Sequence, residues 1–277
     1  MPNFVQRLAN ISSGSQTLVC IGLDPNPELM PITDVVAFNK SIIDATHDLV
    51  CAYKPNLAYY EARGSTGIRQ FEATITHIRD VAPEVVIIAD AKRGDFPPTN
   101  VQYARALFET WGVDAATVNS FLGGDSMEPF LEYEDKASFV LCRTSNPGAA
   151  EFQDVTMQVN GKSMPYYQLI AHRANSWNIR GNVGLVAGAT YPTQLAEIRK
   201  ICPELPLLVP GVGAQSGSLQ QAVQTSINSE GRNSLIASSR SIIYASPNSN
   251  FAEAARTATM NLREEINAVL ENAGFEW

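Results

Sequence analysis

Residues 85–95 read VVIIADAKRGD, so five apolar residues run directly into a segment with four charged residues. A continuous apolar run of this length is typical of a parallel strand covered on both faces. Similar runs recur along the chain, and longer stretches with helical spacing lie between them. Because alternation of strands and helices is the pattern of a parallel sheet, the sequence predicts an α/β fold.

The predicted strands are enough for one (β/α)8 TIM barrel. They are Thr17–Leu23, Cys51–Asn56, Val85–Asp90, Ala115–Asn119, Ser138–Arg143, Asn182–Ala187, Leu207–Pro210 and Ser234–Ser238. The predicted helices are Asp34–Val50, Thr66–Val81, Thr99–Thr110, Met164–Asn178, Pro192–Ile201, Gln215–Thr225 and Asn250–Asn272. An open doubly wound sheet is the architectural alternative. Because no repeat, low-complexity tract or linker interrupts the pattern, we expect a single barrel domain over residues 1–277.

The overall composition restricts the class of protein. The chain has 277 residues, 28 of them acidic and 20 basic, which gives a net charge of −8. Such a balance argues against a chain-wide basic surface for nucleic acid or anionic membrane. No apolar run approaches the roughly 20 residues of a membrane span, and the first 15 residues lack the pattern of a signal peptide. We therefore expect a cytoplasmic protein.

Cysteine and histidine residues give no sign of a metal site. The four cysteines, at positions 20, 51, 142 and 202, form no Cys-x-x-Cys pair, and three of them lie in apolar runs. Buried free thiols are therefore expected. The three histidines fall in predicted helices without partners at metal-ligand spacing, so we expect no zinc site.

Charged residues collect at the ends of the first three predicted strands, and barrel active sites lie at the carboxyl ends of the strands. The first strand leads to Asp24, the second contains Lys54, and the third ends at Asp90 and is followed by Lys92. Asp90 and Lys92 are two residues apart, which puts both on one face of an extended segment. Pairing among these groups and Asp95 would offset the cost of burying each charge alone. A purely structural network of ion pairs at the barrel rim is the alternative interpretation.

The later strands supply a second group of candidate ligand contacts. Residues Pro210–Gln215 follow the seventh strand with two glycines, and Arg240 follows the eighth. Loops after these two strands frequently bind phosphate, which Gln215 could contact through its amide and Arg240 through its guanidinium. The glycines could instead make an ordinary tight turn. Residues Ser145–Gly148, after the fifth strand, could hydrogen-bond a polar ring or form a simple turn.

Asp90-Ala91-Lys92-Arg93-Gly94-Asp95, followed by Thr99-Asn100, resembles the Asp-x-Lys-x-x-Asp signature of the orotidine 5′-monophosphate decarboxylase family. Further matches occur in the family's order at Gly22-Leu23-Asp24, Lys54, Ser145–Gly148, Pro210–Gln215 and Arg240. The resemblance covers most of the chain. It is greatest to the longer bacterial branch, in part because of an insertion at Glu151–Lys162, which is a candidate lid or surface excursion.

The resemblance implies decarboxylation of orotidine 5′-monophosphate to uridine 5′-monophosphate in de novo pyrimidine biosynthesis, with no cofactor. It assigns Lys92 as proton donor to C6 and places Asp90 beside the substrate carboxylate. Lys54 and Asp24 would hold the ribose hydroxyls. Because no Schiff-base arrangement or metal cluster is evident as an electron sink, we expect the carbanion at C6 to be stabilised electrostatically.

The resemblance also implies a homodimer with shared active sites. Asp95 and Thr99 would reach into the site of the neighbouring subunit. Ser145 would bind the pyrimidine, and Gln215 and Arg240 would bind the 5′-phosphate.

Two residues depart from the family's usual pattern. Phe96 replaces a smaller aliphatic residue after the second aspartate, and it could shift the interface that presents Asp95. Ser239 stands before Arg240 where glycine is more usual, and it could alter a backbone contact to phosphate. Neither departure changes a charged residue.

Two other functions compete with decarboxylation of the nucleotide. One is a magnesium-dependent sugar-phosphate decarboxylase or aldolase-like synthase of the same barrel group. Those enzymes have a signature similar to Asp-x-Lys-x-x-Asp. Those relatives place a metal-binding carboxylate at the end of the second strand, where an ammonium group such as Lys54 would repel Mg²⁺. The other is a nucleotide-binding barrel without catalysis, which has little need for Asp90 beside a ligand carboxylate.

Overall fold

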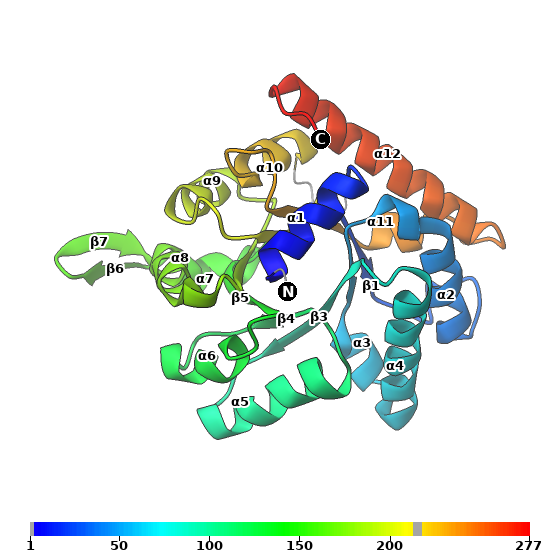
Figure 1. Cartoon of the computed structure of the whole chain (residues 1–277), viewed down its shortest axis with the longest axis horizontal. Coiled ribbons are helices and arrows are strands. Elements are labelled where there is room, and N and C mark those ends of the chain that lie inside the picture. Colours follow the sequence, from blue (N-terminus) through cyan, green and yellow to red (C-terminus); the bar gives the residue numbers. More distant parts are fainter. Residues whose placement is uncertain (1–2, 213–217) are drawn as a thin grey trace.

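The computed structural model describes residues 3–212 and 218–277. Eight parallel strands close into a barrel in the order β1-β10-β9-β8-β5-β4-β3-β2 (Figure 1). They are β1 (Val19–Leu23), β2 (Ala52–Pro55), β3 (Val86–Arg93), β4 (Ala115–Val118), β5 (Ala137–Arg143), β8 (Val183–Ala187), β9 (Leu207–Pro210) and β10 (Ser234–Ser238). The barrel excludes the open-sheet alternative and confirms the predicted (β/α)8 architecture.

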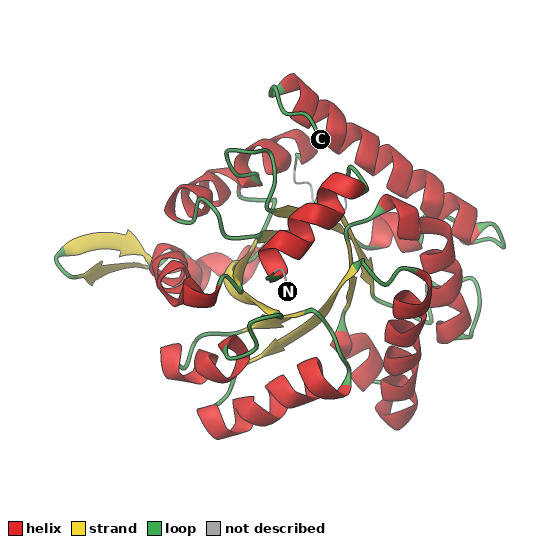
Figure 2. Ribbon diagram, viewed as in Figure 1, coloured by secondary structure: helices red, strands yellow, loops and turns green. Residues whose placement is uncertain are grey.

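Helices surround the ring of strands (Figure 2). Those at predicted positions are α2 (Val35–Thr46), α4 (Gly64–Val81), α5 (Pro97–Ala104), α8 (Tyr166–Trp177), α9 (Pro192–Ile201), α10 (Leu219–Ser226) and α12 (Phe251–Asn272). Asp34 lies outside α2 as its N-cap, and its carboxylate accepts hydrogen bonds from Val36 N and Ala37 N. In the described part of the chain, no helix is long and apolar enough to cross a membrane.

Five α-helices and one hairpin of the described residues were not predicted. The helices are α1 (Phe4–Gly14), α3 (Leu57–Glu61), α6 (Gly124–Leu131), α7 (Ala150–Gln153) and α11 (Arg240–Ile243). Most are one or two turns long, too short for helical periodicity to be distinctive, and α6 also contains Pro129. The hairpin comprises β6 (Thr156–Val159) and β7 (Lys162–Pro165), so the predicted helix from Met164 begins two residues later, at Tyr166.

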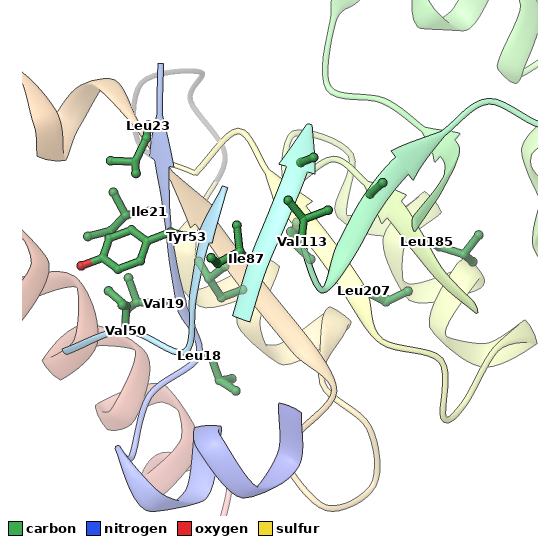
Figure 3. Close-up of a cluster of buried hydrophobic side chains, with 14 of the residues drawn as sticks. Leu18, Val19, Ile21, Leu23, Val50, Tyr53, Ile87, Val113, Leu185 and Leu207 are labelled. Atoms are coloured by element: carbon green, nitrogen blue, oxygen red, sulfur yellow. The ribbon is translucent and has the colours of Figure 1, made fainter. Parts of the chain in front are cut away.

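Side chains alternate between the two faces of the barrel wall. Val19, Ile21 and Leu23 of β1 point outward against the helices (Figure 3). Cys20 points inward, where it joins a second buried cluster with Ile88 and other interior residues. This alternation follows from the two-residue period of a strand. All four cysteines are buried free thiols, as predicted.

Helix α1 closes the amino-terminal end of the barrel. It lies across the barrel centre in Figure 1, and its Phe4 and Leu8 pack with the interior cluster. Arg7 Nη2 lies 2.5 Å from the buried Asp114 carboxylate, which also pairs with Arg79. Asp114 also accepts a 2.8 Å hydrogen bond from Ile87 N. The one carboxylate thus joins α1, α4, β3 and the start of β4.

The Glu151–Lys162 insertion forms most of the β6–β7 hairpin and its approach. The hairpin turns at Asn160 and Gly161, both with positive φ, and projects outward beyond α7 (Ala150–Gln153) and α8 (Figure 1). At its base, the buried Arg143 guanidinium makes hydrogen bonds of 2.7 and 3.0 Å with the Asp154 carboxylate. The hairpin is therefore fastened to the end of β5 and directed away from the barrel centre.

We predict that Asp114→Asn lowers the free energy of unfolding by about 3 kcal/mol, because it leaves two guanidinium groups without their buried counter-charge. Chemical denaturation of the two proteins measures this difference. Asp135→Asn is the control, since Asp135 is exposed and its loss should change stability by less than about 0.5 kcal/mol. Equal stability of the two variants would contradict the role of Asp114.

Candidate active site

A cavity of about 330 Å³ opens at the carboxyl ends of the strands. Its lining includes Asp24, Lys54, Asp90, Gly211, Ser239 and Arg240. These residues come from five strand ends that are widely separated in the sequence, and the closed barrel brings them together. The cavity lies where barrel active sites occur.

Asp90, which lines this cavity, is the centre of a charged cluster. Lys54 Nζ lies 3.1 Å from Asp90 Oδ2, and Lys92 Nζ lies 2.7 Å from Asp90 Oδ1. The side chains of Lys54 and Asp90 are 9% and 11% exposed, whereas that of Lys92 is 50% exposed. Inward alternation along β2 and β3 explains why Lys54 and Asp90 meet. The Lys54–Asp90 ion pair is therefore largely buried, and the Lys92 ammonium group bound to it is the accessible member of the cluster.

Lys92 reaches Asp90 by a different geometry from the extended one that its spacing predicts. In the pairing of β3 with β4, Ala89 is opposite Ala116 and Arg93 is opposite Val118. Three residues of β3, Asp90, Ala91 and Lys92, are thus opposite the single residue Thr117 of β4. This irregularity is a β-bulge. Lys92 has a φ of 48°, a left-handed backbone conformation that is rare for residues other than glycine.

The ion pairs determine the charge of the cluster. Burial alone would raise the pKa of Asp90, but the Lys54 and Lys92 cations outweigh it and hold this pKa well below its ordinary value. Burial would also lower the pKa of Lys54, and the Asp24 and Asp90 carboxylates outweigh that effect and raise it. Both groups are therefore charged at neutral pH.

Asp24 occupies the neighbouring part of the cavity and is held by Ser239. Ser239 Oγ donates a 2.7 Å hydrogen bond to Asp24 Oδ2 and lies 3.2 Å from the Gly22 carbonyl oxygen. A Cβ at Gly22 would come within 2.8 Å of Ser239 Cβ, so this approach requires glycine. Asp24 Oδ1 is buried and has no hydrogen-bond partner among the described residues. The hydrogen-bonding capacity of that oxygen is therefore unfilled within the described part of the chain.

Arg240 and Gly211 also line the cavity, from the ends of β10 and β9. Arg240 is exposed and makes no ion pair within the described part of the chain. Gly211 directly follows β9 and has a φ of 97°, which strongly favours glycine. Gln215, predicted to contact phosphate, lies outside the described residues.

Four predicted site residues do not line this cavity, namely Lys92, Ser145, Asp95 and Thr99. Ser145 follows β5, and its carbonyl accepts a hydrogen bond from Thr190 Oγ1. Asp95 lies on the loop after β3, where its carboxylate accepts a 2.7 Å hydrogen bond from Phe96 N. Thr99 is exposed on α5. Residues 3–212 and 218–277 contain no cluster of three His, Cys, Asp or Glu side chains able to hold a metal ion.

Tyr59 and Asn56 line the cavity although neither was predicted as a site residue. Thr117, which lies behind the cavity against Asp90, was also not identified. A hydroxyl residue at the end of the apolar stretch Ala115-Ala116 was the available signal for Thr117.

Comparison with known proteins gives concordant matches over nearly the whole chain. The sequence profile of the Orotidine 5'-phosphate decarboxylase / HUMPS family matches residues 17–256. A Thermomicrobium roseum protein named orotidine 5'-phosphate decarboxylase is 47% identical over 274 residues, which cover 96% of each chain. A Cellvibrio japonicus protein of the same name is 44% identical over 274 residues, covering 96% of this chain and 98% of its own.

Solved structures agree with these sequence matches. The structure of Leishmania donovani OMP decarboxylase has a TM-score of 0.84 and 36% sequence identity with this chain. The match covers 97% of this chain and 99% of the Leishmania chain. The likeness thus extends from the barrel to its flanking helices.

We predict that Asp90 stabilises the fold at neutral pH and loses this effect in acid. Because its folded-state pKa is lowered, its contribution is complete above the unfolded value of about 3.9 and declines as the pH falls below it. The difference in unfolding free energy between the native chain and Asp90→Asn should therefore shrink from pH 6 toward pH 3. Denaturant titrations across this range measure it, and a constant difference would contradict the prediction.

Proposed function

The chain belongs to the Orotidine 5'-phosphate decarboxylase / HUMPS family, and we propose that its Lys54–Asp90–Lys92 cluster carries the reaction. The chain decarboxylates orotidine 5′-monophosphate to uridine 5′-monophosphate, a step of de novo pyrimidine biosynthesis. The resemblance found in the sequence is confirmed. Because this reaction is biosynthetic and the substrate is a small nucleotide, we also infer a cytoplasmic location.

Asp90 between two ammonium groups is the observation that carries the proposal. Lys54 Nζ, 3.1 Å from Asp90 Oδ2, takes the position from which a metal ion would bind that oxygen. A magnesium-dependent reaction of the sugar-phosphate relatives needs a carboxylate there. Lys54 thus supports nucleotide decarboxylation over that rival. A binding-only barrel would gain nothing from an anion beside a ligand carboxylate.

In the proposed reaction, the bond from C6 to the substrate carboxylate breaks, CO₂ leaves, and the electron pair remains on C6. The Lys92 ammonium, 2.7 Å from Asp90 Oδ1, stabilises this charge and transfers its proton to C6. The resulting amine regains a proton from solvent. Lys92 is suited to this role because half of its side chain is exposed.

Asp90 acts before the bond breaks. An ionised Asp90 about 4 Å from the substrate carboxylate repels it by about 4 kcal/mol at an effective dielectric near 20. Full relief of that repulsion would accelerate the reaction by about three powers of ten. The remaining acceleration comes from Lys92 and from binding energy at the phosphate.

The other cavity residues suit the rest of the nucleotide. The unpartnered Asp24 Oδ1 would accept a hydrogen bond from a ribose hydroxyl, with Lys54 beside it. Arg240 would pair with the 5′-phosphate. Ser145 and Gln215 retain their proposed contacts to pyrimidine and phosphate as expectations from the family resemblance.

We further propose a homodimer in which Asp95 and Thr99 serve the partner's site. Phe96 and Phe121 are 69% and 77% exposed, and their loops are joined by a hydrogen bond from Asn119 N to Arg93 O. Exposed aromatic side chains on adjoining loops are typical of a protein interface. Asp95 would enter the neighbouring site as part of the same contact.

We predict that purified protein consumes orotidine 5′-monophosphate and that Lys92→Ala lowers turnover at least about a thousandfold, since it removes the proton donor. The ultraviolet spectrum of the substrate measures both. Lys40→Ala, on the exposed side of α2, is the control and should retain turnover. A metal chelator should not change turnover. If a chelator abolished turnover, the magnesium-dependent reaction would be favoured instead.

We predict that Phe96→Glu converts the protein largely to monomer and lowers turnover by about tenfold or more, because it buries a charge in the proposed interface. Phe152→Glu, also at an exposed position, is the control. Sedimentation and turnover at several protein concentrations measure the two effects.

Mixed subunits test the sharing of sites. Lys92→Ala and Asp95→Ala subunits, each inactive alone, should together regain roughly a quarter of native turnover, since half of the dimers are hybrids with one intact site. No recovery in verified hybrid dimers would show that Asp95 serves its own subunit.

A further inference from the structure

Thr117 is buried at the end of β4, directly behind the charged cluster. Its Oγ1 donates a 2.8 Å hydrogen bond to Asp90 Oδ1. The same atom accepts a 2.9 Å hydrogen bond from the backbone N–H of Lys92. One hydroxyl therefore contacts both residues that the proposed mechanism places at the reacting carbon.

The chemistry of the groups fixes the direction of these bonds. A backbone N–H can only donate, so the hydroxyl must accept from Lys92. Its single proton is then free to point at Asp90, which must accept. Asp90 Oδ1 thus accepts hydrogen bonds from Thr117 Oγ1 and Lys92 Nζ, while Oδ2 accepts one from Lys54 Nζ. A carboxylate that accepts three donors is held in the ionised form.

The Thr117 hydroxyl also holds the backbone of the β-bulge. Asp90, Ala91 and Lys92 face Thr117 alone, and Lys92 adopts a strained left-handed conformation. Such a conformation persists only where neighbouring contacts hold it. The bond from Lys92 N to Thr117 anchors this backbone, and the backbone in turn sets where the Lys92 side chain begins.

We propose that Thr117 is a positioning residue whose hydroxyl fixes the bulged Lys92 backbone and the Asp90 carboxylate in their reactive arrangement. The inference rests on the proposed roles of Lys92 and Asp90. Thr117 does not line the cavity, so it acts on the reaction rate through these two residues and not through binding of the nucleotide.

The test compares Thr117→Val with Thr117→Ser. Valine keeps the shape and removes the hydroxyl, whereas serine keeps the hydroxyl. We expect Thr117→Val to lower kcat by about 10- to 100-fold, the usual effect of losing a hydrogen bond to a charged group, with KM changed less than about threefold. Thr117→Ser should stay within about fivefold of native kcat.

Thr17→Val is the matched control at the opposite end of the barrel. Thr17 is also buried, and its Oγ1 bonds Leu49 O and Val19 N at 2.9 and 3.1 Å. This variant should lose stability and keep native kcat. Native kcat in Thr117→Val, equal impairment of Thr117→Ser, or equal loss in Thr17→Val would each overturn the proposal.

Amide hydrogen exchange of Lys92 tests the same contact in the native protein, without any substitution. We expect protection of this amide from exchange, and exchange at the rate of an unprotected loop would overturn the anchoring role. Failure of the native protein to turn over orotidine 5′-monophosphate would instead refute the proposed function, so the two failures are distinguishable.

Discussion

The burial of the Asp90 carboxylate is the constraint on which the barrel mouth depends. A carboxylate this far from water is stable only if cations and hydrogen-bond donors surround it. Lys54, Lys92 and Thr117 supply them from three adjacent strands. Because each donor occupies a different direction, the carboxylate cannot rotate without losing a partner. The same requirement that stabilises the charge therefore also orients it.

A local defect in strand pairing makes this arrangement possible. In a regular strand, Asp90 and Lys92 would point to the same face but stand about two residues apart along the strand. The bulge opposite Thr117 draws them together. Backbone strain at Lys92 is the cost, and it lies where the proposed chemistry occurs, as is common for strained residues. Serine at position 239 is a second adaptation, since it orients Asp24 through a bond that glycine could not make.

Much of the fold could be predicted from the sequence because barrel strands are apolar on both faces and most are separated by helices long enough to show helical spacing. Alternation along β1, β2 and β3 also placed Asp24, Lys54 and Asp90 at one rim. The bulge could not be predicted, since register depends on the neighbouring strand and not on residues 85–95 alone. From the sequence, Ser239 is a departure from the family pattern next to the expected phosphate site. Its contact with Asp24 depends on the close approach of the ends of β10 and β1 at Gly22, which no local pattern predicts. Helix α1 could not be predicted because it fills the amino-terminal end of the barrel, and no local sequence pattern indicates that role.

The β6–β7 hairpin has a consequence for how chain length can vary. Its turn at Asn160-Gly161 has the positive φ pair of a tight hairpin turn. The turn lies outside the ring of helices (Figure 1), and Arg143 and Asp154 fix the base. Added residues at the turn would therefore extend into solvent while the ion pair kept the base attached to the end of β5. This makes the hairpin tip a natural point of attachment for a tag, a probe or an inserted segment.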